Sequence, residues 1–193
     1  METASNKIKY GLSNVTIFPI TSTAETGTPT YSTTPIKIPG SVEMKMDANG
    51  EITEFKADNV TYYISASNNG YSGSLTNAKY PTEFKVQCLG QQEDTNGMLI
   101  ESTTDKPSEF GMVYQFEGDQ AATRIVLYRC LATKPGLNHK TKSDTIEPDT
   151  EELSINAMGR LDNGFVKATI EAGTANYDTA LTTMPEPTFT SGL

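Results

Sequence analysis

The sequence predicts a mainly β protein built from short antiparallel strands. Most segments alternate apolar and polar residues with a period of two, and Gly, Asn and Asp bound these segments, as in strands that bury one face. Asn-Gly pairs lie between some of them and favour tight hairpin turns. Helical spacing is confined to two short segments. These observations favour antiparallel strands over a helical or mixed fold.

The first predicted hairpin joins strand 42–47 to strand 51–57 through Asn49-Gly50. In 42–47 the apolar residues stand at even positions and the charged residues at odd positions, so one face can pack while the other meets water. A second hairpin turn is expected at Asn69-Gly70, between the β-branched and aromatic strand 60–64 and strand 71–75. Two successive hairpins predict a meander.

Four further strands follow in two predicted hairpins. Strands 110–116 and 124–132 form the first, and the apolar run 125–128 indicates a central strand covered on both faces. Strands 152–158 and 165–170 form the second, meeting across a turn rich in Asp, Asn and Gly.

One short helix is expected after Pro81. Tyr80, Phe84 and Cys88 lie four residues apart, and Gly90 can end the helix. The same stretch also alternates with a period of two, which leaves a strand open. The Pro and Gly at its ends favour the helix.

A second helix is expected near the C-terminus. Thr174 can cap it, Tyr177, Leu181 and Met184 share one face, and Pro185 ends it. The residues beyond read as an extended arm with one aromatic anchor, or equally as an ordinary frayed terminus.

Composition limits the classes of function. Lys and Arg number 15 against 24 Asp and Glu, a net charge of −9, which argues against a protein that grips duplex DNA through its phosphates. No apolar run approaches the ~20 residues of a membrane span, and the first residues lack the order of a signal peptide. We expect a soluble protein made in a cytoplasm, with Cys88 and Cys130 reduced and buried.

No catalytic, cofactor or metal site is predicted. His139 is the only histidine, and no neighbouring nucleophile and carboxylate complete a catalytic set. The two cysteines and this histidine lack the paired spacings of a zinc site. The runs 47–51 and 94–97 resemble pieces of a calcium loop, but hairpin turns explain them better.

An ordered series of short motifs covers the chain from Lys9 to Ile170. Its members are Lys9–Val15, Ile38–Glu43, Ala57–Asn59 with Tyr62-Tyr63, Asn69–Leu75, Pro81–Phe84 with Leu89-Gly90, Asn96–Glu101, Phe116–Asp119 with Arg124–Cys130, Lys140–Lys142 and Pro148–Thr150. In this order they resemble the major tail protein, or tail tube protein, of siphophages that infect Gram-positive bacteria.

The resemblance implies an antiparallel β-sandwich or split barrel with a flanking helix, assembled into hexameric rings with a β-lined lumen. The rings would stack into the tail tube through which genomic DNA passes without specific binding. Implied partners are other copies of the chain, the tape measure protein, the tail terminator and the tail initiator or distal tail protein. Implied locations are the virion tail and, during assembly, the cytoplasm of the bacterial host. The resemblance implies no catalytic residue and no cofactor.

The expected organisation is a tail tube domain over residues 1–173, with a long loop at about 21–40, followed by a short helix and an extended arm over 174–193. The loop and the extended C-terminal segment supply the candidate contacts between subunits or rings: Thr28, Pro29, Tyr31, Pro35 and Phe189. A mixed charged face is a candidate lining of the lumen or, equally, of the outer surface: Glu43, Lys45, Asp47 and Glu51.

A second reading is a surface-exposed carbohydrate-binding or adhesin-type β-sandwich module. The acidic, Thr-rich composition suggests it. The missing signal peptide and the absence of Trp weigh against it, because sugar-binding platforms favour aromatic side chains.

Overall fold

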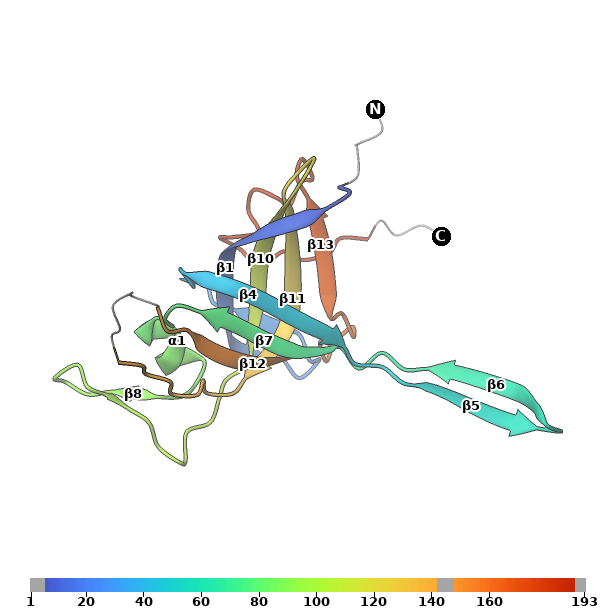
Figure 1. The fold of residues 1–193 in the computed structure, drawn as a ribbon, viewed down its shortest axis with the longest axis horizontal. Helices are drawn as coiled ribbons and strands as arrows, with labels where there is room; N and C mark the ends of the chain where they lie inside the picture. Colours follow the sequence, from blue (N-terminus) through green and yellow to red (C-terminus); the bar gives the residue numbers. More distant parts are fainter. Residues whose placement is uncertain (1–5, 142–147, 190–193) are drawn as a thin grey trace.

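The computed structural model describes residues 6–141 and 148–189. In these ranges the chain forms one antiparallel sheet of nine strands, two separate two-stranded ribbons and one short helix. The mainly β, antiparallel prediction is confirmed. The large sheet curves round on itself, but its end strands do not pair, so the body is an open barrel (Figure 1).

The curved sheet has the strand order β2-β1-β10-β11-β12-β7-β4, with β3 added beside β1 and β13 beside β11. The bounds are β1 Lys9–Thr23, β2 Pro29–Tyr31, β3 Ile36–Lys37, β4 Ser41–Ala48, β7 Tyr71–Asn77, β10 Phe110–Gly118, β11 Thr123–Ala132, β12 Glu151–Met158 and β13 Lys167–Glu171. The two ribbons are β5 (Ile52–Ala57) with β6 (Val60–Ala66), and β8 (Gln92–Glu93) with β9 (Leu99–Ile100).

Strand β11 lies at the centre of the sheet, as the sequence predicts. Ile125 and Leu127 pack into the main core inside the curve, whereas Val126 and Tyr128 pack into a second cluster on the opposite face. Alternate side chains of one strand therefore build both apolar clusters, which explains the continuous apolar run.

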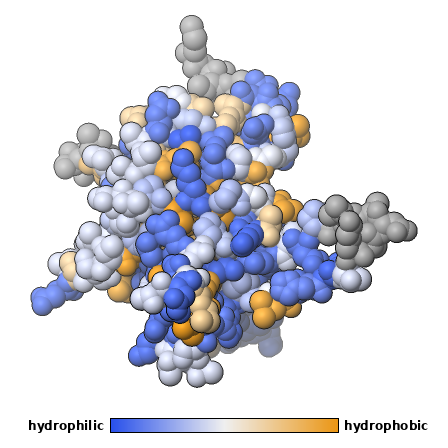
Figure 2. All heavy atoms as spheres, turned by 90° about the vertical axis from the view of Figure 1, so that its left-hand side faces the viewer, coloured by the Kyte–Doolittle hydropathy of each residue, from blue (hydrophilic) through white to orange (hydrophobic). Residues whose placement is uncertain are grey.

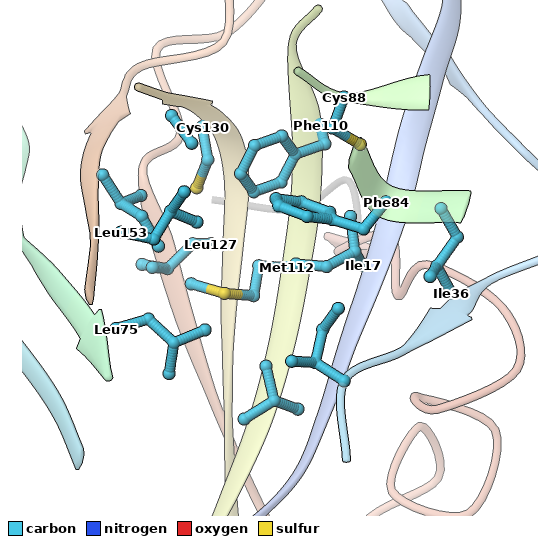
Figure 3. Packing of buried hydrophobic residues seen from close by; sticks show 14 of the residues in the cluster. Ile17, Ile36, Leu75, Phe84, Cys88, Phe110, Met112, Leu127, Cys130 and Leu153 are labelled. Carbon is cyan, nitrogen blue, oxygen red and sulfur yellow. The ribbon is translucent and has the colours of Figure 1, made fainter. Parts of the chain in front are cut away.

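Helix α1 (Thr82–Gln87) covers one end of the main core, and the predicted helix is confirmed. The Phe84 ring meets the Phe110 ring edge-on, with 5.8 Å between centroids (Figure 3). Tyr80, just before the helix, is buried and donates its hydroxyl to the Leu75 carbonyl at 2.6 Å. The helix has six residues, and no helix in the described ranges is long and apolar enough to cross a membrane.

Both cysteines are buried, free thiols in the main core (Figure 3). Burial raises the pKa of Cys88 to about 12 and raises the pKa of Cys130 further above its ordinary value. Thiols in such surroundings are poor nucleophiles, because the thiolate is the reactive form.

The second predicted helix is wrong. Residues 172–183 form a series of turns, in which Tyr177 donates its backbone N–H to Thr174 and Thr182 donates to Thr179. Four Thr together with Asn and Asp explain this, since β-branched and Asx residues favour caps and turns over helix interiors. The apolar side chains expected to share a helix face nevertheless pack together, on the second cluster over β11 and β13.

Strands β12 and β13 do not form the predicted hairpin. Both pair with β11 instead, β13 along Thr123–Leu127 and β12 along Arg129–Ala132. One edge of the ten-residue β11 is long enough to hold the two short strands end to end. The other edge of β12 pairs with β7 over Glu151–Ala157, which carries the sheet round its curve.

The predicted meander from 42 to 75 is also wrong, because its four strands form one long hairpin. Strand β4 pairs with β7, and β5 pairs with β6. Asn49 donates its backbone N–H to Gly70 at 2.8 Å and accepts the N–H of Asn69 at 2.7 Å, so both expected turns lie inside the ladder. The true turn is Asp58-Asn59, with φ of 51° and 61°, the left-handed pair that a two-residue hairpin loop requires.

Residues 21–40 are more ordered than the predicted long loop. Strand β1 runs on to Thr23 and pairs with β2, and β3 pairs with Thr16 and Ile17 of β1. Ile36 and Ile38 are buried in the main core. Two isoleucines two residues apart place this segment as a strand along β1, with short polar turns on either side.

Candidate assembly interface

The most prominent surface feature is the hairpin of residues 51–67, which contains strands β5 and β6. We call this hairpin the arm; it is not the C-terminal segment. It extends away from the body of the molecule (Figure 1), and its strands pair only with each other among the described strands. A lone two-stranded ribbon is marginally stable in water. An arm of this kind therefore gains most of its order from a surface that covers it.

Large apolar side chains cover the arm on both faces. Phe55 and Tyr63 lie opposite each other on one face, whereas Ile64 lies opposite Glu54 on the other. The exposed fractions run from 59% to 75% for the whole set: Ile52, Phe55, Val60, Tyr62, Tyr63 and Ile64. The side of the body turned away from the arm is by contrast mostly hydrophilic, with scattered apolar residues (Figure 2). A gathered apolar surface of this kind marks an interaction site.

A groove of about 470 Å³ lies where the sheet fails to close, between the start of β1 and strand β4. We call it the seam groove. Its lining includes half-buried core side chains, such as Met44, Met46 and Phe116, together with two lysines. The full lining is Lys9, Tyr10, Gly11, Leu12, Val42, Glu43, Met44, Met46, Tyr71, Tyr114, Phe116, Ile125, Leu127 and Lys167.

The two lysines lie over aromatic rings of the groove. The Lys9 ammonium is 5.3 Å from the centroid of Phe116, and the Lys167 ammonium is 4.9 Å from the centroid of Tyr71. Cation–π contacts of this kind keep the ammonium groups at the rim, above an apolar floor. The groove therefore combines apolar surface with two lysines and one carboxylate, Glu43, a net positive lining.

Both sides of the seam present unpaired strand edges. Strand β4 ends the sheet and pairs only with β7 among the described strands. On the edge of β1 away from β10, pairing with β3 begins at Thr16, so Lys9–Ser13 face the seam. Unpaired edges offer backbone hydrogen bonds to an additional strand.

The predicted charged face lies largely on β4. Glu43, Lys45 and Asp47 alternate with the methionines that pack inward, and Lys45 pairs with Asp47 at 3.7 Å. With both side chains about 70% exposed, that pair adds little stability. Glu51 stands apart from these three, at the base of the arm.

The candidate contact residues fall into four places, the last of them at Phe189. Thr28 ends the turn between β1 and β2, Pro29 is the first residue of β2, and Pro35 comes just before β3. Tyr31 is half-buried in the second cluster and donates its hydroxyl to the Tyr128 carbonyl at 2.8 Å, so it already serves the fold of the chain itself.

Phe189 is 72% exposed and its ring lies 5.7 Å from that of Phe165. It thus touches the edge of the second cluster and leaves most of its ring in solvent. An exposed aromatic ring at the end of the described chain is available to a neighbour.

An ion-pair cluster that the sequence patterns did not reveal holds the C-terminal segment on the body. Arg160 is 5% exposed and pairs with Asp162 at 2.7 Å and Glu186 at 2.5 Å. Burial disfavours the charged guanidinium, but the hydrogen bonds to both carboxylates outweigh it and raise the pKa of Arg160. The same contact lowers the pKa of Asp162.

The described residues hold no group of three or more His, Cys, Asp or Glu side chains arranged to bind a metal ion. The surface instead offers an apolar arm, an apolar groove lined by two lysines and one glutamate, and unpaired strand edges.

An open β barrel that leaves such features uncovered belongs to the class of structural subunits whose surfaces are completed by assembly. A family model described as phage tail tube protein matches residues 1–158. The chain therefore belongs to the phage tail tube protein family, with a structural role in the tail of the virion. No match was found among curated proteins.

Proposed function

We propose that the chain assembles into hexameric rings, and that these rings stack into the siphophage tail tube through which genomic DNA passes during ejection. The observation that carries the proposal is the arm, because its apolar side chains are exposed on both faces and neighbouring subunits of a tube would cover them. The family match supports the same conclusion.

Assembly would also satisfy the open edges of the sheet. Strand β4 and the start of β1 present unpaired backbone groups, which favour unregulated sheet growth in a free subunit. A closed ring covers these edges in the same way in every subunit, because every subunit presents identical surfaces to its two neighbours.

The charge of the chain suits a DNA conduit. A net charge of −9 disfavours phosphate binding, so DNA would pass along the tube without stalling. We place the face of Glu43, Lys45, Asp47 and Glu51 on a water-facing wall of the tube, either lumen or exterior.

The proposed partners are further copies of this chain, the tape measure protein inside the tube, and the terminator and initiator, or distal tail, proteins at its ends. Assembly would take place in the cytoplasm of the bacterial host, a Gram-positive bacterium. Thr28, Pro29, Tyr31, Pro35 and Phe189 are proposed contacts between subunits or rings. A Thr28→Lys variant should assemble less well and unfold at the same urea concentration as the unchanged protein.

Negative-stain electron microscopy of the purified protein over a concentration series tests the proposal. We expect rings or hollow tubes. The matched control replaces residues 51–67 by an Asp-Gly turn, which keeps β4 and β7 paired and should leave single subunits. A full-length chain that stays monomeric at every concentration would contradict the proposal.

A further inference from the structure

We propose that the seam groove of one subunit receives the arm of a second copy of this chain. The proposal rests on the assembly function above and adds the surface on which the arm docks. It is carried by the match between arm and groove in polarity, backbone geometry and charge.

The polarity of the two surfaces matches. The arm presents aromatic and branched apolar side chains, and the groove presents a floor that includes Met44, Met46 and Phe116. Methionine side chains are flexible and adapt to irregular partners. The floor is continuous with the main core, so an inserted ring would extend that core rather than rest on a polar surface.

The backbone geometry also matches. The groove lies along the free edge of β4, and the arm is a ribbon whose outer edges are themselves unpaired among the described strands. A strand added beside β4 would form main-chain hydrogen bonds while its alternate side chains enter the groove. That addition would fill the gap that keeps the barrel open.

The charges are complementary. The arm carries Glu51, Glu54 and Asp58 against a single lysine, Lys56. At the groove, Lys9 and Lys167 outnumber the one lining carboxylate, Glu43. Both lysines lie over aromatic rings, and neither forms an ion pair with a described residue. An acidic ribbon entering the groove would give these lysines carboxylate partners at a partly desolvated site.

The occupant must come from another copy because the arm of the same chain points the wrong way. Strand β4 continues directly into the arm, and hydrogen bonds between Asn49 and the 69–70 segment keep the arm in line with β4 and β7. The arm therefore leads away from the body that contains the groove (Figure 1). To reach its own groove it would have to reverse direction and break that ladder.

Disulfide cross-linking between two variants that each carry one added cysteine tests the proposal. One chain carries Phe55→Cys in the arm and the other carries Met44→Cys in the groove, and the mixture is treated with oxidised glutathione as the oxidant. The native cysteines are fully buried and will not compete. The control partner carries Leu137→Cys, which replaces a body residue that is 91% exposed, so exposure alone would favour the control. Urea unfolding of each variant verifies the fold.

We expect the Phe55→Cys and Met44→Cys chains to form a mixed disulfide at least about tenfold faster than the control pair, because docking raises the effective concentration of the two thiols. Equal or slower cross-linking would overturn the proposal. A third variant carries both Phe55→Cys and Met44→Cys in one chain. If it forms the disulfide within that chain, at a rate independent of protein concentration, the choice of a second copy as the occupant is overturned.

The same samples separate this inference from the tube proposal. Tubes seen by electron microscopy without preferential cross-linking would refute docking of the arm in the seam groove and would leave the tube proposal intact. Preferential cross-linking in dimers that never form rings or tubes would support docking of the arm in the seam groove and would refute the tube proposal.

Discussion

Removing two aromatic side chains from the arm should block assembly without unfolding the subunit. Phe55 and Tyr63 lie opposite each other in the ribbon and are 60% and 62% exposed. The double variant Phe55→Thr/Tyr63→Thr keeps residues that favour strands. Because neither ring lies in the core, the free energy of unfolding of the monomer should stay within about 0.5 kcal/mol of the starting value.

The effect on assembly follows from the area that is still exposed. Complete burial of a large apolar side chain contributes about 1.5–3 kcal/mol. Covering the exposed part of each ring should then contribute about 1–2 kcal/mol, or about 2–4 kcal/mol for the pair. Since 1.4 kcal/mol is a tenfold change in an equilibrium constant, the critical concentration for polymerisation should rise roughly 30-fold to several hundredfold.

Sedimentation of polymers over a concentration series measures that critical concentration, and urea unfolding measures the stability of the subunit. The matched control is Leu137→Thr, which removes an exposed apolar side chain from the body and should leave both quantities unchanged. An unchanged critical concentration for the double variant, with normal unfolding, would refute the assignment of the arm to assembly. A large loss of monomer stability would show that the arm is already covered in the single subunit.

Three further predictions concern the body. Gly73→Ala should destabilise the subunit by about 1–3 kcal/mol or more in urea unfolding, because its Cβ would lie 1.9 Å from the Lys45 carbonyl oxygen. The control Gly136→Ala should be neutral, because a Cβ at Gly136 meets no atom within 4 Å. The Arg160 guanidinium lowers the pKa of Asp162, so this contact stabilises the fold above the ordinary carboxyl pKa of about 4 and is lost as the pH falls through the folded value. Arg160→Met should remove that part of the acid sensitivity, measured by urea unfolding from about pH 6 to about pH 2, and an unchanged pH profile would contradict the role of the ion pair. Neither cysteine should react with a maleimide at neutral pH until the chain is unfolded, since both thiols are buried and their pKa values are raised; rapid labelling of the folded protein would show that the core opens.

Several strands could be predicted from local pattern alone. The alternation in 42–47 and the apolar run 125–128 correspond to β4 and to the doubly covered part of β11. Helix α1 was also predictable, because Pro81 is its N-cap and Gly90 follows shortly after its C-cap, Cys88. Each of these signals lies within a few residues of the element that it predicts.

Strand β1 is the main element that the patterns did not predict. It is fifteen residues long, but only residues 15–19 are fully buried, and these form a continuous buried run that contains Thr16 and Pro19 rather than an alternation. Proline usually argues against a central strand. Here Pro19 has β2 and the end of β10 beside it, where the pairing along β1 changes from one partner to another.

The candidate interface was the least predictable part. The sequence predicts a strand at 60–64. Residues such as Tyr62, Tyr63 and Ile64 are typical both of a buried strand and of an exposed arm, so the pattern does not show which of the two forms. The groove depends on Lys9, Met44 and Lys167, which are far apart in the chain. Only the closure of the curved sheet brings them together.

By itself the sequence determined the β class, most of the strands, the acidic charge and the resemblance to tail tube proteins, because these depend on composition, on alternation within short segments and on the order of motifs. The tertiary structure decided which strands pair. Asn49-Gly50 favours a turn locally, but Gly50 serves instead for close approach, since a Cβ there would lie 2.5 Å from the Ser67 carbonyl oxygen across the ladder. The turn forms at Asp58-Asn59, which lengthens the hairpin into the arm. Pairing joins residues distant in sequence, and its free energy comes from contacts that no local pattern contains.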